Sequence, residues 1–189
     1  MVIFTEFLTH YKDLRRLNHF QRCIDFCEVI QLKKSSWKLY VPWILVAEAV
    51  GIVAGILSSE AMQNYTQTVE KPPLSPPEWL FPIVWTILYA LMGIGAARVS
   101  QRQQCPYRSF GLNLYTAQLI VNFFWPLLFF NGMAYGFALL WLILLWILVA
   151  AMILVFYRCE RLAAYLQIPY LLWLTFAAYL NWGVWQMNL

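Results

Sequence analysis

The chain has 189 residues, of which 62% are hydrophobic, 18% are aromatic and only 12% are charged, with a net charge of +4. A soluble domain is nearer half apolar and about a quarter charged, so this composition excludes an ordinary soluble protein. No charged residue lies from position 109 to 157 or from 162 to 189. Since a helix needs about 20 apolar residues to cross a bilayer, the composition predicts an integral membrane protein.

Five stretches are long and apolar enough to be transmembrane helices. They are Tyr40–Leu57, Trp79–Ala97, Phe110–Phe130, Met133–Tyr157 and Leu162–Trp185. The first ends at Ser58-Ser59-Glu60, and Asn131-Gly132 predicts a tight turn between the third and the fourth. No stretch shows the alternating pattern of barrel strands. The sequence therefore predicts an all-α integral membrane fold, a single bundle of five transmembrane helices with short connections.

Basic residues fall almost entirely on one side of this arrangement. Seven precede the first span, three border the connection between the second and third spans, and two lie between the fourth and fifth; Lys71 alone falls on the other side. By the positive-inside rule, this distribution places the N-terminus in the cytoplasm and the C-terminus outside. We expect a multi-pass protein of a bacterial cell membrane.

Residues 1–36 form a separate region ahead of the membrane domain at 37–189. They carry mixed charges, are moderately amphipathic and include His10 and His19. They lack the apolar core and cleavage site of a signal peptide. Three readings stay open: a basic helix on an anionic membrane surface, a disordered tail, and an over-extended start codon.

The four cysteines form two pairs by position. Cys23 and Cys27 are four residues apart, close enough to share a helix face, but no second ligand pair accompanies them as a zinc site would require. Cys105 and Cys159 both fall on the predicted cytoplasmic side, where disulfides are rare. We expect four free thiols and no metal site.

Few residues in the predicted spans offer catalytic chemistry. The spans contain no histidine that could ligate haem iron. Glu48 is the only ionisable residue deep within a span; it either has a proton-linked role, or faces a polar cavity or reaches for the interface. Gly51 and Gly55 form a G-x-x-x-G pattern that lets helices approach closely, for a homodimer or for packing within the bundle.

A proline-dense loop lies directly before the second span. Lys71 is followed by Pro72, Pro73, Pro76 and Pro77, and each proline restricts both itself and the preceding residue, so the loop is stiff. Trp85 and Tyr89 follow on one helix face. This layout predicts either a lidded pocket for a flat, apolar ligand or a tight turn with an interfacial aromatic belt.

Two other spans carry aromatic and amide side chains at helical spacing. Asn122 and Trp125 are three apart in the third span, and Trp173 and Ala177 are four apart in the fifth. An amide in hydrocarbon needs a hydrogen-bond partner. Asn122 therefore predicts a bond to another helix or to a ligand.

Three segments of the chain, in order, resemble the TspO/MBR family of tryptophan-rich sensory proteins and translocator proteins. They are YTQTVEKPPLSPPEWLFPIVWTILY, QLIVNFFWPLLFF and IPYLLWLTFAAYLNWGVW. The resemblance covers about residues 40–189 and implies a five-helix membrane bundle with a pocket beneath the first loop. It further implies porphyrin or haem as a ligand, no required cofactor, and, as in some members, degradation of protoporphyrin in light and oxygen.

The resemblance also implies roles for particular residues. It places two oxidisable pocket tryptophans, the tentative catalytic residues, at Trp85 and Trp173. Ligand contacts are implied at Trp85, Tyr89, Asn122, Trp125, Trp173 and Ala177, with Pro76 and Pro77 in the lid. The chain departs from many bacterial members in having Tyr65-Thr66 where they have Trp-Tyr, which should weaken the lid contact. The cholesterol motif of animal members lacks its basic residue here, where Gln186 stands, so specific cholesterol binding is not expected.

The sequence thus predicts a membrane sensor or regulator that binds a tetrapyrrole, with porphyrin degradation as an added activity. The alternative is a transporter of porphyrins or similar amphipathic molecules, which Glu48 alone supports weakly; a scaffold is a third reading. The expected partners are the tetrapyrrole and membrane lipid, with no nucleic acid.

Overall fold

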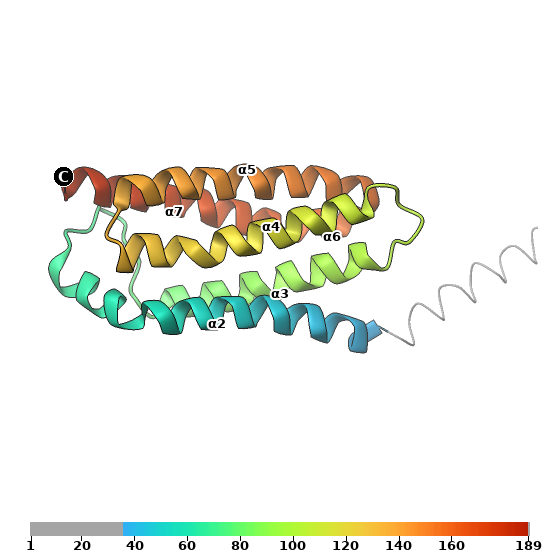
Figure 1. Ribbon diagram of the computed structural model, residues 1–189, viewed down its shortest axis with the longest axis horizontal. Coiled ribbons are helices and arrows are strands. Elements are labelled where there is room, and N and C mark those ends of the chain that lie inside the picture. Colours follow the sequence, from blue (N-terminus) through green and yellow to red (C-terminus); the bar gives the residue numbers. More distant parts are fainter. Residues whose placement is uncertain (1–35, 189) are drawn as a thin grey trace, which may run out of the picture. The chain divides into compact units, whose positions relative to one another are not determined.

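The computed structural model describes residues 36–188, and this part of the chain is helical without strands. The helices are α2 (Ser36–Thr68), α3 (Leu80–Ser100), α4 (Arg108–Pro126), α5 (Tyr135–Cys159), α6 (Arg161–Tyr165) and α7 (Ile168–Met187), with a π-helical turn η1 (Leu127–Asn131) after α4. From Tyr40 onward the long helices run side by side (Figure 1). Five segments are long and apolar enough to cross a membrane. The predicted all-α bundle of five transmembrane helices is confirmed, and the chain is an integral, multi-pass membrane protein.

The first span extends further than its apolar stretch. Helix α2 continues past the predicted end of the span at Leu57 and stops at Thr68. Polar side chains in the added turns bond to the helix itself: the Thr66 hydroxyl donates to the Gln63 carbonyl at 2.7 Å, and the Thr68 hydroxyl donates to the Asn64 carbonyl at 2.8 Å. Polar residues thus end the apolar run without ending the helix, and the predicted boundary was wrong.

The fifth predicted span consists of two helices rather than one. Helix α6 ends at Tyr165, residues 166 and 167 form a turn, and α7 begins at Ile168 with Pro169 in its first turn. Proline has no N–H for a helical bond and crowds the preceding turn. It therefore suits the start of α7 but interrupts a continuous helix.

The connection between α4 and α5 is the tight turn predicted at Asn131-Gly132. The backbone N–H of Gly132 donates to the Leu127 carbonyl at 2.9 Å and closes the wide turn of η1. In this turn the residue with a left-handed backbone is Met133, with φ of 46°, whereas Gly132 has φ of −82°.

Two glycines set the contact between α2 and α3. A methyl group on Gly51 would clash with the ring of Tyr89, and one on Gly93 would clash with the backbone of Ile44. Gly55, by contrast, has open space around it. At Gly51 the G-x-x-x-G pattern therefore serves helix packing within the bundle, which is one of the two predicted readings.

The expectation of free thiols at Cys105 and Cys159 was wrong. The two residues form a disulfide, with Cα atoms 5.5 Å apart, between the α3–α4 connection and the last residue of α5. Compartment chemistry suggested thiols, but it carries no information about which residues the fold brings together. Cys23, Cys27, His10 and His19, with the rest of residues 1–35, lie outside the described residues, and the division of the chain at residue 36 stays a prediction.

Beside the disulfide, one carboxylate holds two arginines. Glu160 pairs with Arg98 of α3 at 2.8 Å and with Arg102 of the α3–α4 connection. Burial alone would raise the pKa of the Glu160 carboxyl, but the hydrogen bonds and charges of the two arginines outweigh it and lower the pKa. The end of α5 is therefore tied to α3 both by charge and, through the connection, by a covalent bond.

Candidate functional site

Three aromatic side chains, Trp85 and Tyr89 of α3 and Tyr170 of α7, form a cluster inside the bundle, called the aromatic group below. The rings of Trp85 and Tyr89, one helical turn apart, have centroids 5.5 Å apart and planes tilted by 32°. Trp85 also meets the ring of Tyr170 on α7 edge-on at 6.2 Å. Tyr89 and Tyr170 are buried, whereas Trp85 is half-buried. The predicted shared face of Trp85 and Tyr89 is thus directed into the bundle and toward α7.

The amide of Asn122 finds its partner on another helix. Its Nδ2 donates to the Tyr89 hydroxyl at 3.0 Å, and the residue is only 2% exposed. Of the two readings of this amide, a bond to another helix is present in the structure. The bond fixes α4 to α3 at the level of the aromatic group.

A second buried amide, Gln118, was missed by sequence reasoning. Its Oε1 accepts a hydrogen bond from the Tyr170 hydroxyl at 3.1 Å, and its Nε2 lies 3.6 Å from the sulfur of Met92. Gln118 lies one turn before Asn122 on α4. The rule that singled out Asn122, that an amide in hydrocarbon needs a partner, would have found it.

Trp173 lies on α7 and borders a groove rather than meeting Trp85 directly. Its ring contacts Phe81 at 5.9 Å and Phe176 at 5.7 Å. Among the described residues no aromatic contact joins it to Trp85. The groove, of about 520 Å³, runs between α3 and α7 and is lined by Val84, Ile87, Leu88, Leu91, Pro169, Leu172, Trp173 and Phe176.

Trp125 connects two groups of apolar side chains. It packs against the main core together with Trp85, Trp173 and Ala177, and it stacks on Phe129 at 5.3 Å. Phe129 is in turn 5.4 Å from the ring of Tyr65. The structure therefore gathers the predicted aromatic residues of three helices on one continuous apolar core.

The proline loop is attached to the end of α7. The Tyr179 hydroxyl donates to the Pro73 carbonyl at 3.1 Å. Asn188 donates through Nδ2 to the Glu70 carbonyl at 3.0 Å and accepts from the Glu70 N–H at 3.2 Å. Pro72 is buried so closely against Gly183 that a methyl group on this glycine would clash with the proline ring.

The predicted lid prolines differ from those that anchor the loop. Pro76 is half-buried and Pro77 is exposed, whereas the buried proline is Pro72. Lys71 pairs with Glu78 across the loop at 3.2 Å. Sequence reasoning found the loop, and its stiffness stays a prediction; the residues of α7 that hold the loop carry no recognisable local signal.

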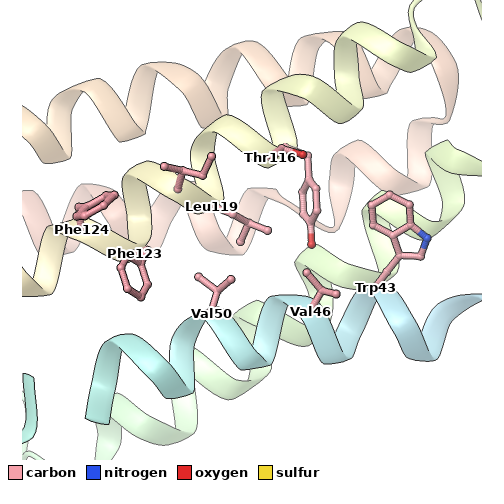
Figure 2. A pocket seen from close by; sticks show the side chains of 9 residues that line it. Trp43, Val46, Val50, Thr116, Leu119, Phe123 and Phe124 are labelled. Atoms are coloured by element: carbon pink, nitrogen blue, oxygen red, sulfur yellow. The ribbon is translucent and has the colours of Figure 1, made fainter. Parts of the chain in front are cut away.

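A separate groove of about 370 Å³ lies between α2 and α4. Figure 2 shows Val46 and Val50 of α2 pointing toward Leu119 and Phe123 of α4 across it. Its complete lining is Trp43, Val46, Val50, Tyr115, Thr116, Leu119, Ile120, Phe123 and Phe124. None of the predicted site residues borders this groove.

Glu48, the predicted ionisable group within a span, is half-buried on α2. Within residues 36–188 it has no hydrogen bond or ion pair. Among the described residues, no hydrogen-bonded or ion-paired side chain therefore marks Glu48 as part of a proton relay.

Comparison with known proteins agrees with this architecture. The family model described as the TspO/MBR family matches residues 43–186. The chain is 34% identical over 154 residues to "Protein CrtK" of Rhodobacter capsulatus, covering 81% of this chain and 94% of that protein. It is 36% identical to "Tryptophan-rich protein TspO" of Chlorobaculum tepidum, over 74% of this chain and 89% of that one. It is 34% identical to the human "Translocator protein", over 78% of this chain and 92% of that one. The chain therefore belongs to the TspO/MBR family.

Proposed function

We propose that this protein is a membrane sensor or regulator that binds a tetrapyrrole such as protoporphyrin or haem. The supporting observation is that Trp85, Tyr89, Trp125, Trp173 and Ala177 belong to, or pack on, one apolar core. A tetrapyrrole is a large, flat π-system, and aromatic side chains stack on such a ring with a gain beyond area burial. Membership of a family whose relatives include proteins named as sensory supports the regulatory role.

The groove beside Trp173 has the size and chemistry for part of such a ligand. Its volume of about 520 Å³ lies within the range of about 300–1,000 Å³ typical of small-molecule sites, and its lining is apolar. Its lining residues Leu88 and Trp173 belong to the same apolar core as Trp85. A ring seated between α3 and α7 would therefore lie against Leu88 and Trp173, side chains of the same apolar core as Trp85.

We further propose that light and oxygen lead to degradation of bound porphyrin, with Trp85 and Trp173 as electron donors. Indole is readily oxidised, so a tryptophan beside a photoexcited porphyrin can lose an electron to it. The reactive chemistry belongs to the porphyrin, light and oxygen, while the protein holds the geometry. A transporter of porphyrins is the alternative function, and Glu48 is the residue through which coupling would have to act.

The first experiment is a titration of protoporphyrin IX and haem into detergent-purified protein, followed by tryptophan fluorescence in the dark and under light. Saturable quenching supports the binding site, and its absence for both ligands would reject the tetrapyrrole proposal. Bleaching of the porphyrin spectrum beyond a free-porphyrin control supports the degradation. Porphyrin flux into proteoliposomes would instead favour the transporter.

We also propose that the N-terminus is cytoplasmic and the C-terminus external, in a bacterial cell membrane. Support comes from the twelve of thirteen basic residues that fall on one side of the spans. An alkaline phosphatase fused after Leu189 should be active, and a fluorescent protein fused there should stay dark. The reverse pattern would overturn the orientation. The homodimer stays a proposal that cross-linking in membranes would test.

A further inference from the structure

The disulfide joins two elements that the arginine–glutamate cluster already holds together. Cys105 lies in the α3–α4 connection, three residues after Arg102, and Cys159 directly precedes Glu160. The side chains of Arg98 and Arg102 both bond to Glu160. A covalent bond and a charged cluster therefore hold together the same corner of the bundle, where the α3–α4 connection meets the end of α5.

This corner lies on the side of the chain that carries most of the basic residues. Under the orientation proposed above, on which this inference rests, the disulfide faces the cytoplasm. Structural disulfides are rare in that compartment because cellular dithiols reduce them, and those that form there are usually transient and redox-sensing. A bonded pair in this position is therefore better explained by exchange than by permanent cross-linking.

The surroundings of the two sulfurs suit thiol–disulfide exchange. Both cysteines are partly exposed, and Gln103, Gln104 and Pro106 beside Cys105 are exposed. Arg158 and Arg161 lie within two residues of the second cysteine along the chain, and the adjacent carboxylate of Glu160 is paired with both Arg98 and Arg102. Positive charge near a sulfur stabilises the thiolate, which is both the attacking and the leaving species in exchange.

Opening the bond would release one segment and leave the rest of the corner attached. Arg98 of α3 donates to Glu160 at 2.8 Å, and the Glu160 side chain is only 10% exposed. This contact does not depend on the disulfide. The connection 101–107 would lose its covalent attachment to α5 and keep the bond of Arg102 to Glu160, together with its bonds to the end of α3 from Gln101 to the Ala97 carbonyl and from the Arg102 N–H to the Val99 carbonyl.

We propose that Cys105 and Cys159 form a redox modification site, opened by a cytoplasmic dithiol protein and closed again by a disulfide or peroxide oxidant. In the opening step, a thiolate of the dithiol attacks one sulfur and the S–S bond of this chain breaks. The dithiol's second thiol then releases the mixed disulfide. Two electrons and two protons pass to this chain, leaving two thiols here and a disulfide in the partner. The released segment is the connection 101–107.

The site is tested in intact cells that carry the full chain with Cys23→Ser and Cys27→Ser, so that only the two cysteines of the site react. Cells are quenched in acid, free thiols are labelled with a polymer-linked maleimide, and the gel shift is read. We expect thiols in resting cells and a disulfide after a pulse of diamide, with return to thiols after diamide is removed. Cys105→Ser and Cys159→Ser serve as controls that cannot close. A pair that stays bonded throughout, or one that never bonds, would overturn the proposal.

A second measurement follows the released segment in purified protein. After reduction with dithiothreitol in mild detergent, we expect trypsin to cleave after Arg102 several-fold faster, because local opening exposes the backbone, while the helical circular dichroism is unchanged. Equal cleavage rates before and after reduction would reject release of the connection.

A third measurement separates this inference from the functions proposed above. In membrane vesicles first oxidised with diamide, a membrane-impermeant phosphine reductant should open the bond when the vesicles are inverted and not when they are right-side-out. Opening only in right-side-out vesicles would place the pair outside and reject both the cytoplasmic exchange and the orientation. The porphyrin titration is independent of this result, so tetrapyrrole binding and the redox site can fail separately.

Discussion

The ring of Tyr89 on α3 lies so close to Gly51 on α2 that no side chain larger than hydrogen fits between them. The same tyrosine accepts a hydrogen bond from Asn122 on α4 at 3.0 Å. One side chain therefore sets the distance between two helices and attaches a third. Because its neighbour Trp85 is a predicted ligand contact, this packing also positions the candidate site.

Replacing Gly51 with alanine should destabilise the bundle. The added methyl group must displace the Tyr89 ring, and overpacking of this kind costs about 1–3 kcal/mol. Gly55→Ala is the matched control, because a methyl group there meets open space and alanine favours the helix by about 1 kcal/mol. Thermal unfolding in detergent should show a lower midpoint for Gly51→Ala only. If both variants keep the wild-type midpoint but lose a cross-linked dimer, the glycines serve association instead.

Binding and photochemistry should separate in the variant Trp85→Phe/Trp173→Phe. Phenylalanine keeps most of the apolar contact, so we expect protoporphyrin affinity within about tenfold of wild type, or about 1.4 kcal/mol. Light-dependent change in the porphyrin spectrum should be lost, because the oxidisable indoles are gone. Trp182→Phe, at a residue that is 52% exposed, is the control. Conversion at the wild-type rate in the double variant would move the chemistry elsewhere, with Trp125 the next candidate.

Detaching the proline loop from α7 should speed both binding and release of ligand. Asn188→Ala removes two hydrogen bonds to Glu70, and Gly183→Ala forces Pro72 outward. We expect faster porphyrin association and dissociation in stopped flow for each variant. Asn131→Ala is the control, since it removes a single side-chain bond, to the Leu57 carbonyl, in another connection.

The same variants provide a readout that needs no ligand. Leu74, at the tip of the loop, is 79% exposed, and chymotrypsin should cleave after it faster once the loop is detached. Unchanged cleavage in both loop variants would show that the loop is held by its own stiffness rather than by α7.

The Glu160 cluster should make stability depend on acid pH. The pKa of the Glu160 carboxyl is lowered from the ordinary glutamate value of 4.5. The contribution of this carboxylate to stability is therefore present above that value and is lost as pH falls through the lowered pKa. The melting temperature of the wild type should therefore fall in acid more steeply than that of Glu160→Gln. Glu78→Gln is the control, because its partner Lys71 pairs with it at the exposed surface, where ion pairs contribute little. Parallel pH profiles for wild type and Glu160→Gln would contradict the assignment.

Several features of the candidate site followed from local sequence. The spacing of Trp85 and Tyr89 placed both on one helix face, and their rings are in contact. The amide of Asn122 required a partner, and one is present. These predictions hold because helical spacing and the need to satisfy a polar group in hydrocarbon are local constraints. These local constraints could not identify the partner, Tyr89, because it lies on another helix.

Other features depend on residues that are distant in the chain. The loop was recognisable as stiff from its prolines, but its attachment to Asn188 joins positions 118 residues apart. The disulfide likewise joins cysteines 54 residues apart, and the expectation of thiols failed because composition and compartment do not encode proximity. The end of α2 was misplaced for a different reason, since the hydropathy that bounds a membrane span does not bound a helix.

The sequence alone determined that this protein crosses a membrane five times, because lipid exposure demands long apolar helices whose backbone bonds are satisfied within each segment. It also determined the family, through three ordered motifs. Only the tertiary structure decided that Gly51 receives Tyr89, that Pro72 packs on Gly183, and that Cys105 meets Cys159. Those contacts depend on how neighbouring helices approach, which is set by the shapes of side chains from distant parts of the chain packing together.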